Sequence, residues 1–196
     1  MSNLMDYLDW RGDLTFREAP FNEVDNLILA QLVYVEFAGI VPAPGEEGTI
    51  TVKEACELFF AAHDRKEIME RVSMTKTAAF VLEKMAQTER FCNAQLFGYI
   101  NDISKEEQSQ FSVVCVRLDD KSIYVSFSGT DNTIVGWREN FNMGYLSETP
   151  GQLKAVDYLN HMVKEDWKKI RVGGHSKGGN LSLYIALTMK KNCRIS

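Results

Sequence analysis

The sequence predicts an α/β fold in which a mixed sheet follows an N-terminal helical part. Three observations predict it: helical stretches fill most of residues 51–93, short strand-like runs follow them, and strand and helix patterns then alternate. Strands that alternate with helices form a sheet covered by helices. The 196 residues, 45% of them hydrophobic, are enough for one well-buried domain. We expect a single domain over residues 1–196, with a helical part at 21–93 and a sheet part at 96–196.

The first half of the chain is expected to be mainly helical. Residues 1–20 are mixed and turn-rich, and a helix is expected over residues 24–37 after the candidate N-cap Asn22. This helix is apolar on most faces, which is typical of a buried core helix; a lid or membrane-facing element is the alternative. Pro and Gly residues at 41–48 predict a loop, and three helical stretches then fill most of residues 51–93.

The second half is expected to combine strands with helices. Runs rich in β-branched and aromatic residues predict a β-meander of three strands, at residues 96–103, 111–118 and 123–127. Apolar residues at helical spacing predict a helix near 153–163, and a short strand is expected at 170–172. A glycine-rich turn follows this strand and leads into a last helix, expected from Gly178 to about Lys191.

Composition and charge exclude several classes of protein. A net charge of −5 and an isoelectric point near 5.3 argue against a phosphate-binding surface, so nucleic acid is not an expected partner. The four cysteines are widely spaced and no histidines stand at ligand spacing, which predicts neither a metal site nor a disulfide framework. No stretch reaches about 18 apolar residues, and the N-terminus lacks the features of a secretion signal. We expect a cytoplasmic protein with no transmembrane segment, metal or cofactor.

One motif carries the chemistry: Gly174, His175, Ser176, Lys177 and Gly178. A strand is expected before it and a helix after it, which is the setting of the Gly-x-Ser-x-Gly nucleophile elbow of α/β-hydrolases. Both glycines are needed because a side chain at either position would collide with the neighbouring strand or helix. The helix N-terminus favours developing negative charge, so the backbone N–H of Lys177 is a candidate oxyanion donor. A glycine-rich turn without chemistry is the alternative; the common phosphate-binding glycine motifs are absent.

Two segments resemble class 3 lipases. The run from Gly173 to Leu181 is similar to the nucleophile motif of that family. Ile123–Thr130, followed by Asp131 and Trp137, is similar to the lipase strand that ends in Phe-Arg-Gly-Thr or Phe-Arg-Gly-Ser. The chain as a whole resembles an uncharacterised bacterial family of lipase-like domains. The resemblance implies an α/β-hydrolase-like mixed sheet.

The resemblance also implies roles for individual residues. Ser176 is the expected nucleophile, Thr130 is the expected second oxyanion donor, and Gly129 allows close approach. The sequence departs from the family at Ser128, where Arg is usual, so contacts beneath the oxyanion loop are expected to differ. In the nucleophile motif it departs at Lys177, where Leu is usual. The other motif residues are expected to be structural: Gly174, His175, Gly178 and Gly179.

The base and the acid of a catalytic triad are missing from this sequence. A serine nucleophile needs a base, normally a histidine oriented by an acid, and in this fold both follow the serine. Residues 177–196 contain no Asp, Glu or His. The three histidines, His63, His161 and His175, are expected to have ordinary structural roles. We therefore expect a truncated domain without its C-terminal strands, whose unpaired sheet edge would invite homodimerisation.

The function expected from these patterns is that of a serine hydrolase acting on a small-molecule carboxylic ester or thioester, inactive as this fragment. The alternative is a catalytically silent domain that keeps the fold as a binding or interaction module. The Lys177 side chain is expected to be solvated at the cleft mouth; a Ser–Lys dyad or a contact to an anionic substrate group are the alternatives. Asp131 is expected to cap the loop beside Thr130, with a substrate contact as the alternative.

Overall fold

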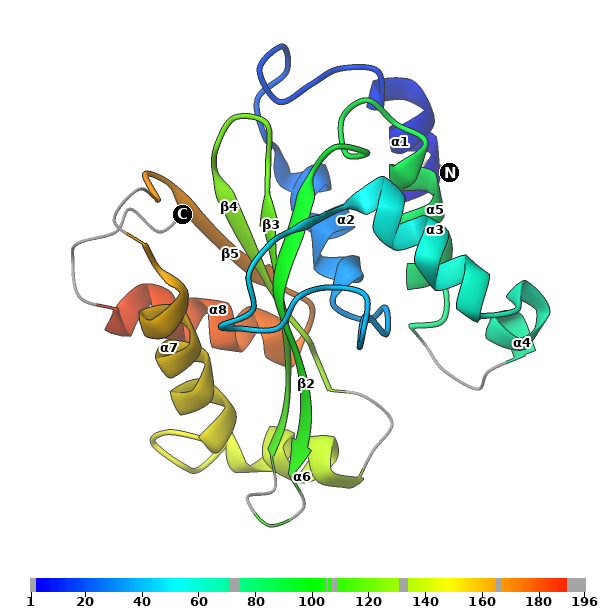
Figure 1. The fold of residues 1–196 in the computed structure, drawn as a ribbon. Helices are drawn as coiled ribbons and strands as arrows, with labels where there is room; N and C mark the ends of the chain where they lie inside the picture. Colours follow the sequence, from blue (N-terminus) through cyan, green and yellow to red (C-terminus); the bar gives the residue numbers. More distant parts are fainter. Residues whose placement is uncertain are drawn as a thin grey trace.

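Five strands form one mixed sheet in the described part of the chain (Figure 1). The computed structural model describes residues 3–70, 75–104, 106, 109–130, 134–164 and 167–189. Strands follow each other across the sheet in chain order: β1 (Ile50–Thr51), β2 (Gln95–Ser104), β3 (Ser109–Arg117), β4 (Ile123–Phe127) and β5 (Ile170–Gly174). Pairs from β1 to β4 are antiparallel, and β5 joins β4 in parallel. The predicted α/β class and β-meander are confirmed.

Helices in the first half of the described chain lie before β2: α1 (Leu4–Arg11), α2 (Glu23–Leu32), α3 (Val52–Ala62), α4 (Arg65–Glu70) and α5 (Ala78–Ala86). The predicted cap Asn22 is confirmed, because its side chain accepts hydrogen bonds from the first turn of α2. That helix ends earlier than expected. Val33, Val35 and Phe37 are buried beyond its end, so the apolar run continues into the core without helical structure.

Helix α1 corrects the expectation that residues 1–20 are only turn-rich. Its N-cap Asn3 accepts hydrogen bonds from the backbone of the first turn, and Asp6 bonds back to the N–H of Asn3. This reciprocal pair is a capping box, which satisfies backbone donors that would otherwise lack partners. Local capping therefore starts a helix whose apolar pattern is weak.

Three helices accompany the later strands: α6 (Ile134–Asn142), α7 (Pro150–Met162) and α8 (Lys177–Thr188). α7 and α8 lie where the apolar spacing and the glycine-rich turn predicted helices. α6 is an addition, since no helix was expected there.

The sheet is buried on both faces. Along β3, Val114 and Val116 pack into a core shared with helices α1, α2, α3 and α5. Val113 and Cys115 point the other way, into a core shared with α7 and α8. Figure 1 shows the same arrangement, with α7 and α8 on one side of the strands and the earlier helices on the other. Two-sided burial explains why every residue of β4 is buried and why its apolar residues do not alternate with exposed polar ones. No helix in the described ranges is long and apolar enough to cross a membrane.

Candidate functional site

The turn between β5 and α8 holds Ser176 in an unusual backbone conformation. Its φ is 56° and its ψ is −119°, in the left-handed half of the map that residues with a side chain seldom occupy. The Ser176 side chain is exposed, and the helix begins at the next residue. The N–H of Gly178 donates to the His175 carbonyl at 3.0 Å, which closes the turn. Such strained positions cost on the order of 1–3 kcal/mol and cluster at functional sites.

Glycine is required on both sides of this turn because backbone packs directly on backbone. A Cβ at Gly174 would lie 2.8 Å from the carbonyl carbon of Gly178, and closer still to the Phe127 carbonyl oxygen. A Cβ at Gly178 would lie 2.9 Å from the carbonyl carbon of Phe127, and again closer to its oxygen. The end of β4 therefore fits against the end of β5 and the start of α8 with no space for side chains.

Gly179 is different, although it belongs to the same run of glycines. The nearest atom to a Cβ there is the Gly174 carbonyl oxygen, at 3.3 Å. That distance is tight, but the Gly174 carbonyl oxygen needs to move by only a few tenths of an ångström to make room for an alanine at this position.

The loop that follows β4 lies against Ser176. A Cβ at Gly129 would lie 3.3 Å from Ser176 Cβ and 2.5 Å from the His175 carbonyl oxygen, so the two chain segments touch here. The Gly129 N–H donates to the Tyr34 hydroxyl at 2.8 Å, which anchors the loop to the segment that follows α2. Burial raises the pKa of Tyr34, so the phenol is neutral at physiological pH.

Thr130, the next residue, carries a buried hydroxyl oxygen that has no hydrogen-bond partner among the described residues. Ser126 and Ser128 share this property. A buried polar group without a partner costs roughly 1–3 kcal/mol, so such a group needs a reason. Ser128 stands where the lipase pattern has Arg, and its unpartnered hydroxyl makes none of the contacts that a guanidinium would make. Asp131, the candidate loop cap, lies outside the described residues.

The side chain of Lys177 is buried, and the expectation that it is solvated was wrong. Its Nζ lies 2.6 Å from Glu139 Oε2, and both side chains have 0% exposure. The ammonium also donates to the Gln110 carbonyl oxygen. A buried amine keeps its charge only where a carboxylate or other acceptors replace water, and Glu139 supplies the carboxylate. This partner lies on α6, 38 residues upstream.

Glu139 connects four elements. Its Oε2 accepts hydrogen bonds from Lys177 and, at 3.1 Å, from the N–H of Gln110 in β3. Its Oε1 accepts from the N–H of Gly151, in the first turn of α7, at 2.9 Å. Lys177 opens α8, while Glu139 itself lies in α6. The sequence pattern around Trp137 does not indicate this contact, because the partners of Glu139 lie far from it in the chain.

The histidines do not supply a base to Ser176. His63 Nδ1 lies 2.9 Å from the Phe59 carbonyl oxygen, and its ring stacks on that of Phe59. His161 is solvent-exposed and lies one helical turn from Asp157, 3.5 Å from its carboxylate. His175, for which the resemblance implies a packing role, is exposed. Within the described ranges, no hydrogen bond joins the Ser176 hydroxyl to a histidine.

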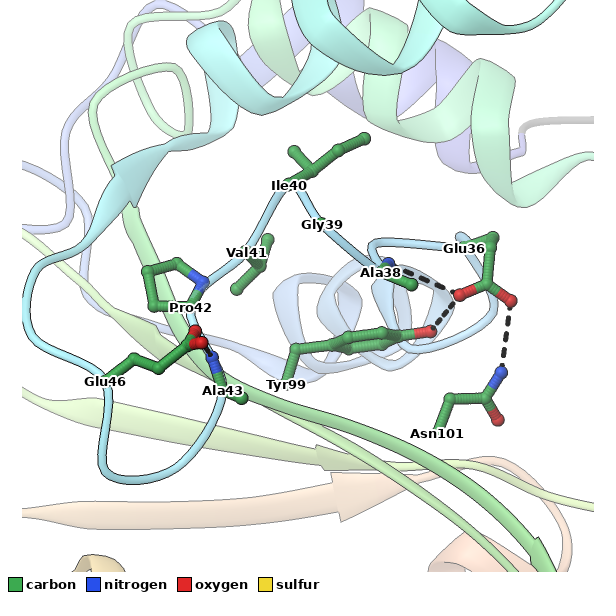
Figure 2. A pocket seen from close by; sticks show the side chains of 10 residues that line it. All are labelled: Glu36, Ala38, Gly39, Ile40, Val41, Pro42, Ala43, Glu46, Tyr99 and Asn101. Atoms are coloured by element: carbon green, nitrogen blue, oxygen red, sulfur yellow. Dashed lines mark hydrogen bonds between the residues drawn. The ribbon is translucent and has the colours of Figure 1, made fainter.

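A separate polar pocket of about 520 Å³ lies beside the segment that follows α2 (Figure 2). The Glu36 carboxylate accepts hydrogen bonds from the Tyr99 hydroxyl at 3.2 Å and from the Asn101 amide at 3.1 Å. Burial and the neighbouring Glu36 raise the pKa of Tyr99. Asn101 in turn accepts from the Ser112 hydroxyl at 2.7 Å. Ser176 is not among the residues that line this pocket, and the carboxylate is already engaged by donors.

The described residues contain no group of three His, Cys, Asp or Glu side chains arranged to hold a metal ion. A family model with the description Mbeg1-like matches residues 85–195, which is more than half of the chain. This span includes the Ser176 turn, the Thr130 loop and Glu139. No curated protein and no solved structure gives a significant match.

Proposed function

The chain belongs to the Mbeg1-like family, which is a lipase-like family, and on this premise we propose that it is a serine hydrolase of α/β-hydrolase-like fold. The substrate is a carboxylic ester or thioester, and Ser176 is the nucleophile. The observation that carries this proposal is the backbone of Ser176. Its left-handed conformation, between a strand and the first residue of a helix, is what a nucleophile elbow requires to present a serine hydroxyl.

The loop after β4 carries the second group that the proposed reaction needs. In acyl transfer, the serine oxygen attacks the carbonyl carbon and the carbonyl oxygen becomes an oxyanion that needs hydrogen-bond donors. We assign these donors to the backbone N–H of Lys177 and the hydroxyl of Thr130. The close approach of Gly129 to Ser176 supports this assignment, as does the absence of a partner for the Thr130 hydroxyl. An oxyanion in this position would give that hydroxyl an acceptor.

The reaction then follows the usual two stages. The tetrahedral intermediate collapses, the alcohol or thiol leaves with a proton, and the acyl group stays on Ser176 as an ester. Water hydrolyses that ester, releases the carboxylic acid and restores the serine. The proton of the serine hydroxyl needs a base, and Lys177 is unsuited to this task because its ammonium is held in a fully buried pair with Glu139. We therefore do not propose a Ser–Lys dyad, in which Lys177 would act as the base.

A fluorophosphonate probe tests the nucleophile in the full-length protein. Ser176 is expected to be labelled, as mapped by mass spectrometry, and Ser176→Ala is expected to abolish labelling. Ser147→Ala, which changes an exposed serine before α7, is the matched control and should label as the natural protein does. Absence of labelling in the natural protein under all conditions would contradict the proposal and favour a catalytically silent interaction module.

Thr130→Val tests the oxyanion donor. Valine keeps the shape of threonine and replaces the hydroxyl with a methyl group. Because the hydroxyl has no partner among the described residues, the melting temperature should stay the same or rise. Turnover of a simple aryl ester should fall by about a hundred- to a thousandfold, the usual effect of losing one oxyanion donor. Unchanged turnover in a stable variant would remove Thr130 from the mechanism.

A further inference from the structure

We infer that the buried ion pair between Lys177 and Glu139 is a positioning device, which holds the two proposed oxyanion donors at a fixed distance from each other. This inference rests on the proposed function and adds two positioning residues to it. Neither side chain is proposed to touch substrate.

The first reason is where the two residues lie in the chain. Lys177 immediately follows Ser176, and its own backbone N–H is one of the proposed donors. Glu139 lies in α6, and that helix begins only four residues after Thr130, the other proposed donor. The ion pair therefore ties the helix that follows one donor to the helix that carries the other. The two donors themselves lie far apart in the chain, so the covalent path between them is much longer than the path through the ion pair.

The second reason is that hydrogen bonds tie the ion pair to two further elements, β3 and α7. Gln110 in β3 donates its N–H to Glu139 and accepts from Lys177 with its carbonyl, so it bridges both partners. Gly151 approaches the other carboxylate oxygen so closely that a side chain at this position would overlap it. The pair is thus fixed against the sheet and against α7, and neither residue can shift without breaking backbone hydrogen bonds.

The third reason is that stability alone does not require charges here. Replacing a buried ion pair with apolar residues of similar volume is often neutral or stabilising, because both charges must lose their water. The lipases that this sequence resembles usually have Leu at the position of Lys177. An apolar side chain fills space without a preferred direction, whereas a charged pair with three further hydrogen bonds has one geometry. Direction is what an oxyanion hole needs, since a displacement of about 1 Å can cost about a hundredfold in rate.

Three variants of the full-length protein separate positioning from stability. Lys177→Met leaves a buried carboxylate without its cation and is expected to lower the melting temperature markedly. The double variant Lys177→Met with Glu139→Gln removes both charges and should regain part of the stability, because the Gln oxygen can still accept from one of the two backbone N–H groups that Glu139 binds. Lys154→Met, which breaks the exposed pair with Asp102, is the matched control and should behave as the natural protein in every assay.

The deciding readout is the rate at which Ser176 reacts with a fluorophosphonate in a variant that is stable. The double variant is expected to react at least about tenfold more slowly than the natural protein, with the loss in the maximal rate rather than in probe affinity. A stable double variant that reacts at the natural rate would overturn the inference. Should the double variant not fold, Glu139→Asp keeps the charge but shortens its reach by one methylene group, and the same slowing is expected of it.

Amide hydrogen exchange measures the coupling between α6 and α8 without any labelling reaction. If the natural protein does not react with the probe, the proposed function is contradicted, but the positioning by the ion pair can still be measured in this way. Peptides from α6 and from the first turn of α8 should both exchange faster in the double variant, by about tenfold, and be unchanged in the Lys154 control. Exchange equal to that of the natural protein in both segments would show that the pair does not couple them.

Discussion

Replacing Gly178 with alanine should destabilise the protein, whereas the same change at the adjacent Gly179 should not. A Cβ at Gly178 meets backbone atoms of Phe127 and Ser128, all at about 3 Å or less. Phe127 is fully buried at the end of β4. Its backbone carbonyl is fixed in the sheet and cannot rotate away as the end of a flexible side chain could. Relief requires α8 and β4 to separate by on the order of 1 Å in a closely packed interior.

The magnitude follows from two opposing terms. Forcing an extra carbon into a well-packed site costs about 3 kcal/mol at the upper end of the usual range, and backbone neighbours place Gly178 there. Alanine is favoured over glycine inside a helix by about 1 kcal/mol, which offsets part of this cost. A net loss of about 2 kcal/mol corresponds to a fall of about 4–8 °C in melting temperature for a chain of this size. At Gly179 the helical gain balances a milder contact, so we expect a change within about 2 °C.

Thermal unfolding followed by circular dichroism measures both variants under the same conditions. Fluorophosphonate labelling of the full-length proteins adds a second readout, since the same displacement moves Ser176 relative to Thr130. Equal melting temperatures for Gly178→Ala and Gly179→Ala would refute the close backbone packing on which the site geometry depends.

Two further predictions concern the surroundings of the site. Tyr34→Phe removes the acceptor of the Gly129 N–H and should lower the free energy of unfolding by about 1–2 kcal/mol in urea titrations. Tyr145→Phe makes the same change at an exposed position and is the control. Asp120→Asn tests pH dependence: burial opposes ionisation, but hydrogen bonds from Ser122 and the nearby Arg171 outweigh it and lower the pKa of Asp120. A lowered folded-state pKa stabilises the protein above the ordinary value of 3.8, and this contribution is lost as the pH falls through the folded-state pKa. The natural protein should therefore exceed the variant in stability at pH 6 and lose this advantage on acidification.

The strands could be predicted from the sequence because their signal is local. The run at residues 123–127 consists mainly of β-branched and aromatic residues, and β4 has those bounds in the structure. Asn22 predicted the start of α2 for a similar reason, since an N-cap acts on the backbone two and three residues away. Such signals need no knowledge of distant partners.

Helix α6 could not be found in this way. It contains Gly136 and Asn140, which have low helix propensity, and its large apolar side chains Trp137 and Phe141 are mostly exposed instead of forming a buried stripe. What holds the helix in place is the carboxylate of Glu139, whose partners lie in β3, α7 and α8. The same long-range pairing explains the misplaced Lys177, because a lysine in a sequence is expected in water unless its acceptor is known.

The direction of β5 decides whether the two halves of the proposed site can meet. β4 and β5 run in parallel, and Phe127 is opposite Gly174. Segments that leave parallel neighbouring strands emerge at the same edge of a sheet, so the Gly129 loop and the Ser176 turn are brought together. An antiparallel β5 would send them to opposite edges.

The register of β5 is fixed as firmly as its direction. Gly173 is opposite Ser126, and a Cβ at Gly173 would lie 2.5 Å from the side-chain oxygen of Asn26 and closer still to the Tyr124 hydroxyl. A slip of one residue would bring the side chain of Val172 into this space and turn every side chain of the strand to the opposite face. Gly173 therefore opposes the slip that brings in Val172, and the observed register keeps Ser176, three residues later, beside Gly129.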